Sequence, residues 1–396
     1  MAVYKIFPEK DATMYSLFPQ MNTGLDEILD VSNLNFAVDN YAQAARYLVK
    51  FNQNDIDNVF DTYISNSQWS SDFKCFIATA QSINLDYELF VYPVSGSWGM
   101  GTGKYLDQPI STDGVSWQWK TYKGGQQWGV VTSMNLYITA SYSGSNIGGG
   151  VWYHNSTYPF SIIASQSFSY HSDKDLNVNV KNIVEVWRSS SLGTAVGDGT
   201  QINNEGFLVK WKSYPERSYE DTEGYPVEFN PAKAVQPVLQ YYSVDTHTIY
   251  PPTLEIKWDD SIYATSSQVP LINTPQAYIS IINNNGFFYS QSIQQFRVDC
   301  RPQFPPIIFQ TASIYTTNYY LPTASYWAIK DLDTNEYVVD FDSTYTKLSA
   351  DATSSFFTVY MNGLQPERYY TILIQTTIGG TTQVFDSNYN FKVING

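Results

Sequence analysis

The sequence predicts an all-β protein whose C-terminal part forms a small antiparallel β-sandwich. Three observations predict this fold class. The chain of 396 residues contains 33 Tyr, 22 Phe and 10 Trp, and only 15% of its residues are charged. Short runs of β-branched and aromatic residues, which are typical of strands, recur along its whole length. Stretches with the 3.6-residue periodicity of an amphipathic helix are scarce.

Composition excludes several classes of protein. A disordered chain would have few aromatic residues and a high charge, and a membrane-spanning helix needs about 18–20 consecutive apolar residues, which this sequence does not contain. The 22 basic and 37 acidic residues give a net charge of −15. Nonspecific affinity for nucleic acid requires clustered Lys and Arg. We therefore expect no membrane span and no nucleic-acid partner.

Six runs in the first two thirds of the chain predict strands: residues 46–51, 73–80, 87–92, 133–140, 207–211 and 253–258. Asn84 lies between the second and third runs, so we expect these two runs to form a hairpin. The last run alternates, which predicts that Leu254, Ile256 and Trp258 share one face of their strand.

Two segments predict helix. Val180, Ile183, Val184 and Trp187 are spaced so that they form a single apolar stripe. Residues 180–187 are therefore expected to form two helical turns that close the end of a sandwich. Residues 55–60 predict a further helical turn.

Two segments, residues 93–129 and 143–159, predict long loops rich in glycine and tryptophan. Long loops in compact domains are usually functional or held by a partner. Three interpretations of their aromatic residues stay open: the rings fold back and cap the sandwich, they form a protein interface, or they stack on sugar rings. The candidate contact residues are Trp98, Trp117, Trp119, Trp128, Trp152 and Tyr153.

A domain boundary is predicted after the strand at 253–258, because the following segment is rich in Ser, Thr, Pro and Gln. We expect a first domain at residues 1–262, a linker at 263–275 and a second domain at 276–396. The first domain holds 28 of the 37 acidic residues.

The second domain is predicted to be an immunoglobulin- or fibronectin III-like sandwich. Its expected strands are residues 326–331, 337–341, 356–360, 369–375 and 391–394, with hairpin turns at 333–336 and at Gly379-Gly380. The segment from Leu364 to Tyr369 resembles the Leu-x-Pro…Tyr corner of fibronectin III-like domains, where a tyrosine hydroxyl bonds to upstream backbone. A plain proline turn is the alternative.

No sequence pattern predicts catalysis. The glycine-rich residues 96–105 fail as a phosphate-binding loop, because Trp98 replaces a required Gly and Tyr105 a required Ser or Thr. Neighbouring carboxylates on a strand point to opposite faces, so they do not form a glycosidase pair. The three histidines and two cysteines lack the spacing of a zinc site. We expect no cofactor, no metal and no enzymatic activity, and we expect Cys75 and Cys300 to be buried and unbonded. A calcium site of Asp and backbone carbonyl groups, without EF-hand spacing, stays an open alternative.

The first domain resembles the DNRLRE-type family of carbohydrate-binding modules, which are jelly-roll β-sandwiches. The resemblance begins with Asp11-Ala-Thr, Asn22-Thr-Gly and residues 28–31, and it continues with the arginine-led run at 46–51. Ser97-Trp98 with residues 114–117, the segment 178–187, Gly206-Phe-Leu and residues 254–256 are similar to later parts of the family pattern. Gln236 stands where the family has an arginine, and residues 239–252 hold an insertion.

The details are most similar to the versions found in virion proteins of tailed bacteriophages, especially marine myoviruses of cyanobacteria. Residues 100–104 (Met-Gly-Thr-Gly-Lys) and 362–370 carry this similarity. It implies a virion protein that assembles in the host cytoplasm, which agrees with an N-terminus that lacks a secretory pattern.

The leading hypothesis is a non-enzymatic structural protein of the tail, baseplate or neck. Its expected partners are other virion proteins and further copies of itself in a symmetric homo-oligomer, with host-surface glycan as an additional contact. The alternatives are a carbohydrate-binding module for host or environmental glycans, a capsid decoration protein, and an enzyme such as a surface depolymerase.

Overall fold

The structure is a computed structural model. It describes residues 2–35, 42–65, 68–80, 86–128, 137–138, 148–153, 161–169, 171–194, 201–211, 238–272, 274, 276–304 and 317–396. The chain forms two compact units. The N-terminal unit comprises Ile6–Val59 and Ser71–Glu255, and the C-terminal unit comprises Met1–Lys5, Phe60–Ser70 and Ile256–Gly396.

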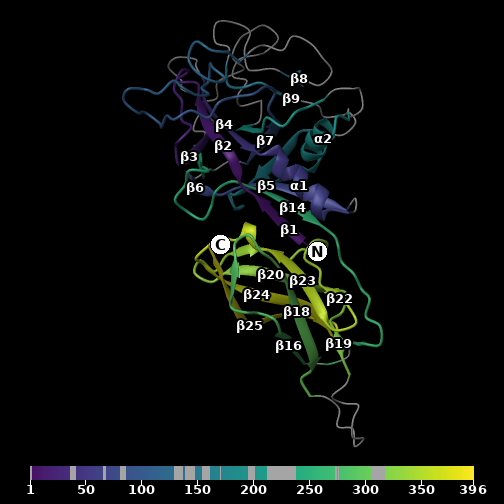
Figure 1. Cartoon of the computed structure of the whole chain (residues 1–396). Coiled ribbons are helices and arrows are strands. Elements are labelled where there is room, and N and C mark those ends of the chain that lie inside the picture. Colours follow the sequence, from purple (N-terminus) through teal and green to yellow (C-terminus); the bar gives the residue numbers. More distant parts are fainter. Residues whose placement is uncertain are drawn as a thin grey trace, which may run out of the picture. The chain divides into compact units, whose positions relative to one another are not determined.

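The predicted all-β class is confirmed, since antiparallel sheets dominate the chain and the described residues include only two α-helices (Figure 1). The largest sheet has the order β10–β7–β12–β4–β3–β13–β6, with β2 beside β4. Its strands are β2 (Pro8–Tyr15), β3 (Ile28–Asn35), β4 (Ala42–Phe51), β6 (Ile77–Ala80), β7 (Tyr87–Pro93), β10 (Ala164–Phe168), β12 (Phe207–Trp211) and β13 (Leu239–Tyr242).

A second sheet has the order β1–β14–β5–β11, and a further pair joins β8 to β9. These strands are β1 (Ala2–Ile6), β5 (Trp69–Cys75), β8 (Tyr137–Ile138), β9 (Trp152–Tyr153), β11 (Leu176–Asn179) and β14 (Thr253–Trp258). In β14, Leu254, Ile256 and Trp258 are buried as the alternation predicts. Glu255 is buried as well, because it forms an ion pair with Lys74 at 3.0 Å.

Both predicted helices form and are longer than expected: α1 spans Gln53–Tyr63 and α2 spans Lys181–Ser191. The predicted stripe of α2 is confirmed, since Ile183, Val184 and Trp187 are buried. Trp187 packs on Phe207 of β12 with ring centroids 4.7 Å apart. The apolar stripe therefore attaches α2 to the large sheet.

The predicted hairpin of residues 73–80 and 87–92 is wrong. The first run divides into β5 and β6, which lie in different sheets and pair with β11 and β13. The strand β7 pairs with β10 and β12 instead. A strand-forming run does not specify its partner, and here packing between distant segments decides the pairing. Asn84 lies outside the described residues, as do residues 133–136 and 139–140 of the predicted strand at 133–140.

The C-terminal unit is a sandwich of two sheets, with the orders β16–β18–β23–β22 and β17–β25–β24–β20–β21. Their strands pair antiparallel except for β17 and β25, which are parallel, as is the short pair β15–β19. All five predicted strands are present. The strands and the 3₁₀ turn are β15 (Val269–Pro270), β16 (Ala277–Ile281), β17 (Phe287–Tyr289), β18 (Ile293–Pro302), β19 (Tyr319–Tyr320), β20 (Ser325–Asp331), β21 (Tyr337–Val339), β22 (Ser349–Ala350), β23 (Ser355–Tyr360), η2 (Met361–Gly363), β24 (Tyr369–Ile378) and β25 (Thr381–Ile394).

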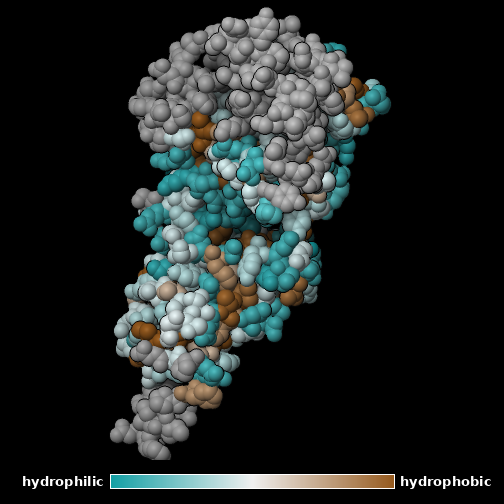
Figure 2. Space-filling model, turned by 180° about the vertical axis from the view of Figure 1, so that it is seen from behind, coloured by the Kyte–Doolittle hydropathy of each residue, from teal (hydrophilic) through white to brown (hydrophobic). Residues whose placement is uncertain are grey.

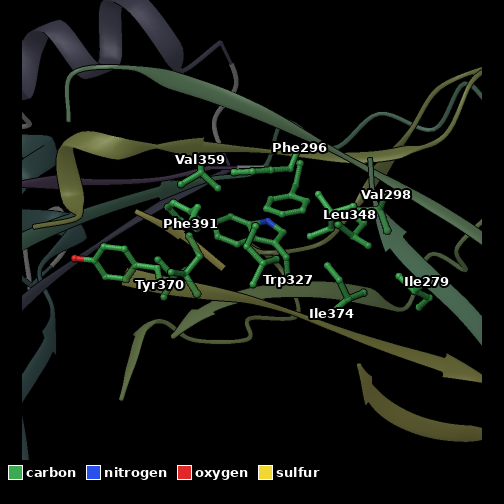
Figure 3. Packing of buried hydrophobic residues seen from close by; sticks show 14 of the residues in the cluster. Ile279, Phe296, Val298, Trp327, Leu348, Val359, Tyr370, Ile374 and Phe391 are labelled. Atoms are coloured by element: carbon green, nitrogen blue, oxygen red, sulfur yellow. The ribbon is translucent and has the colours of Figure 1, made fainter. Parts of the chain in front are cut away.

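The core of this sandwich contains a group of packed aromatic rings among aliphatic side chains. Trp327 of β20 is buried beside Phe296 and Phe391 (Figure 3) and stacks on Phe357 at 5.0 Å. Both predicted hairpin turns form, and Gly379 and Gly380 adopt the positive φ angles that favour glycine in the second. Cys300 is buried in this core and Cys75 is buried in the N-terminal unit, and both are free thiols, as predicted.

The tyrosine corner is present, but Tyr370 rather than Tyr369 forms it. Tyr370 is buried, and its hydroxyl group donates to the carbonyl oxygen of Gln365 at 3.0 Å. In Figure 3 this hydroxyl group points away from Trp327. Tyr369 lies on the opposite face of β24 and is exposed.

Candidate functional site

The structure brings four of the six candidate aromatic residues together. Trp98, Trp117, Trp128 and Trp152 are buried in one hydrophobic cluster that also includes residues of β2, β4, β7 and β12. Trp119 and Tyr153 are half-buried. Residues 129, 143–147 and 154–159 of the two predicted loops lie outside the described residues.

Cationic side chains cover the faces of the buried indole rings. The guanidinium carbon of Arg46 lies 4.8 Å from the ring centroid of Trp117 and 5.4 Å from that of Trp152. Arg46 is itself buried, and its Nη1 donates to the carbonyl oxygen of Gly149 at 2.7 Å. The Lys10 ammonium group lies 4.4 Å from the ring centroid of Trp98. Attraction between a cation and an aromatic face is strongest where water is excluded, so these contacts fix the loops onto the sheet.

The indole N–H groups of two of these rings form hydrogen bonds within the protein. The indole N–H of Trp98 donates to the carbonyl oxygen of Glu205 at 2.8 Å, and that of Trp128 to the carbonyl oxygen of Ser116 at 2.9 Å. This placement favours the interpretation in which loop tryptophans fold back and cap the sandwich. In this structure the four buried rings present no open face for a sugar ring or a partner protein.

Two loops that are far apart in the sequence form one unit, here called the loop pair (residues 16–25 and 101–114). Its centre is the buried amide of Asn22. The amide nitrogen donates to the carbonyl oxygens of Met100 at 2.6 Å and Val115 at 2.8 Å. Its oxygen accepts from the backbone N–H groups of Gly24 at 3.2 Å and Gly103 at 2.8 Å. The Asn22-Thr-Gly and Met100-Gly-Thr-Gly motifs are therefore parts of one hydrogen-bonded assembly.

Glycine is required at this contact. A Cβ atom on Gly24 would lie 2.1 Å from the carbonyl oxygen of Met100. A Cβ atom on Gly101, which has a φ of +81°, would lie 2.3 Å from Oδ1 of Asn22. Both distances are far below van der Waals contact. The signal available in the sequence was an Asn-x-Gly motif together with closely spaced glycines.

Asp11, the first residue of the Asp-Ala-Thr motif, has a structural role as well. Its side chain is buried, and Oδ2 accepts from the backbone N–H of Val244 at 2.6 Å. Burial raises the pKa of Asp11 well above its ordinary value. The described residues contain no group of three or more His, Cys, Asp or Glu side chains that could hold a metal ion.

A second set of aromatic residues, not predicted as a site from the sequence, is exposed on the C-terminal unit. It is here called the outer aromatic face (Phe287, Tyr289 and Tyr369). Phe287 of β17 pairs with Lys392 of β25, and Lys392 pairs with Tyr369 of β24. Residues directly opposite each other on paired strands share a face of the sheet, so Phe287 and Tyr369 flank Lys392. Phe287, Tyr289 and Tyr369 are 56%, 54% and 49% exposed. The sequence Phe287-Phe288-Tyr289 shows no alternation of polar and apolar residues, so it gave no signal that only Phe288 is buried.

Comparisons with known proteins find no family model, no curated protein and no solved structure that matches this chain. Among the described residues, neither helix is long and apolar enough to cross a membrane.

Proposed function

We propose that the chain is a non-enzymatic structural or accessory protein of a tailed-bacteriophage virion, located in the tail, baseplate or neck, which binds other virion proteins and further copies of itself. The outer aromatic face is the observation that carries this proposal. It presents three large exposed rings on one face of a sheet, where they are available to a partner.

The distribution of exposed apolar residues supports a role in assembly. Of the 21 large hydrophobic side chains exposed among the described residues, 13 belong to the C-terminal unit. Figure 2 shows several such residues, in brown, at the surface. Soluble monomers rarely expose large contiguous apolar patches, and Tyr and Phe are enriched in protein interfaces.

Lys392, which lies between Phe287 and Tyr369 on the outer aromatic face, carries a charge that can be buried against a partner. Lys392 lies over the ring of Tyr369, with 5.7 Å between its ammonium group and the ring centroid, and forms an ion pair with Glu367. Burying a lysine that keeps a carboxylate partner costs less desolvation free energy than burying an unpaired lysine. The low fraction of charged residues, 15%, and the resemblance to phage virion proteins support the choice of a virion as the assembly.

A complementation experiment tests the proposal. Particles would be produced with the wild-type chain, with Phe287→Ser/Tyr369→Ser, or with the control Leu192→Ser, which changes an exposed residue of the N-terminal unit. We expect the double variant to be incorporated at least tenfold less well, because hot-spot truncations cost about 2 kcal/mol or more, while the control is incorporated normally. Absence of the wild-type chain from purified particles would refute the proposal.

Glycan binding is the second candidate function, because exposed aromatic rings also stack on sugars. Phe287 and Tyr369 lie two strand spacings apart, about 10 Å, which suits an extended oligosaccharide. Binding to a glycan array that is lost in Tyr369→Ala would favour this function over assembly. A capsid decoration protein differs from the leading proposal only in its position in the particle.

A further inference from the structure

The loop pair carries most of the exposed apolar side chains of the N-terminal unit. Among the described residues of that unit, eight large hydrophobic side chains are exposed, and five of them lie on these two loops. They are between 37% and 51% exposed, and they are Leu17, Leu25, Tyr105, Leu106 and Ile110.

The backbone of the loop pair is already held in one conformation. The N–H of Lys104 donates to Asp107 at 3.0 Å, and the N–H of Tyr105 donates to Asp26 at 3.0 Å. Asp113 accepts from the backbone N–H and the hydroxyl group of Thr102 at 3.0 and 2.6 Å. A partner that binds here loses little free energy in ordering the loop, which favours affinity.

Tyr105 combines anchoring with exposure. Its ring packs against Tyr15 and Phe18, with centroid distances of 4.8 and 6.2 Å, and yet 44% of the residue stays exposed. A ring that is fixed on one side and open on the other loses little side-chain entropy on binding. Rigid aromatic residues of this kind are enriched among interface hot spots.

The surroundings of these apolar residues are acidic. Oε1 of Glu27 lies 3.6 Å from Nζ of Lys104 and 3.8 Å from Nε2 of His247, whose side chain is exposed. Lys123 donates its backbone N–H to Thr112 and so lies beside the loop. Five carboxylates stand against these two lysines. Asp107 and Asp113 belong to the loop pair, Asp26 and Glu27 follow its first segment directly, and Asp245 lies in the neighbouring Ser243–Asp245 segment.

We propose that the loop pair is a docking surface for a partner protein whose contact region has an apolar centre and a rim of Lys and Arg. Complementary charge favours such a rim. A symmetric contact between two copies of this surface would place the carboxylates of one copy against those of the other, so a second copy is not the occupant. The inference rests on the proposed function in one respect, since the partner is another protein of the same assembly.

Peptide binding to the full chain tests this surface. The probe is a synthetic peptide of alternating leucine and lysine, and its counterpart has glutamate in place of lysine. We expect the lysine peptide to bind and Leu106→Ser/Ile110→Ser to raise its Kd about tenfold, as for loss of interface anchors, while the matched control Leu192→Ser leaves the Kd unchanged. Glu27→Gln/Asp107→Asn should also weaken binding and reduce its dependence on salt.

Three results would overturn the docking surface: no binding of the lysine peptide, equal binding by the wild type and Leu106→Ser/Ile110→Ser, or equal binding of the glutamate peptide. Self-association that is lost in Leu106→Ser/Ile110→Ser would overturn it too, because the occupant would then be a second copy. Absence of the chain from particles, by contrast, refutes the proposed function and leaves the peptide result standing.

Discussion

Replacing Asn22 with alanine should destabilise the N-terminal unit strongly. The substitution removes four hydrogen bonds at once, two donated to the carbonyl oxygens of Met100 and Val115 and two accepted from the N–H groups of Gly24 and Gly103. A buried polar group left without a partner costs about 1–3 kcal/mol. Because water can replace some of the lost partners, we expect the free energy of unfolding to fall by about 3–5 kcal/mol.

Urea denaturation followed by tryptophan fluorescence measures this change, since Trp98, Trp117 and Trp128 report on the same region. The matched control is Asn54→Ala, at an exposed position of α1, which should change stability by less than about 0.5 kcal/mol. Hydrogen exchange at residues 101–114 should accelerate in Asn22→Ala alone. A loss of less than about 1 kcal/mol would refute the reasoning, because the amide would then not hold the two loops together.

Three further substitutions test buried groups. Burial raises the pKa of Asp11 above its value in the unfolded chain. The protonated Asp11 side chain therefore contributes stability at low pH, and this contribution is lost as the pH rises through the folded pKa. In urea titrations the stability of Asp11→Asn relative to wild type should increase with pH. Burial opposes ionisation of Asp331, but hydrogen bonds from Arg368 and the backbone outweigh it and lower its pKa, so Arg368→Ala should cost about 2–4 kcal/mol at neutral pH and less as the pH falls through that pKa. Tyr370→Phe removes the hydrogen bond to Gln365 and should lower the denaturation midpoint by the equivalent of about 1 kcal/mol; an unchanged midpoint would show that the corner bond adds no stability.

Local patterns predicted individual elements well. The strands β12 and β14 have the bounds that their residue types indicate, and the stripe of α2 faces the core. Strand pairing was not predictable in the same way. The run at 73–80 has the composition of one strand, but its two halves join different sheets. Which half pairs with which partner depends on segments more than 90 positions away, and the sequence pattern of a single run holds no information about them.

The candidate site, too, could not be predicted from local sequence patterns. Glycine-rich loops with several tryptophans are typical of binding surfaces. Here Arg46, on a strand distant in sequence, packs on the buried rings of Trp117 and Trp152. Tyrosines such as Tyr369 are inconspicuous among the 33 in the chain. Their exposure follows from the register of β24 against β25, which becomes known only with the fold.

A cryo-electron microscopy map of the intact particle tests the central claim most directly. The account predicts density for this chain in multiple copies in the tail, baseplate or neck, with Phe287 and Tyr369 buried against a neighbouring subunit. A particle that lacks the chain, or one in which both rings face solvent in every copy, would contradict it.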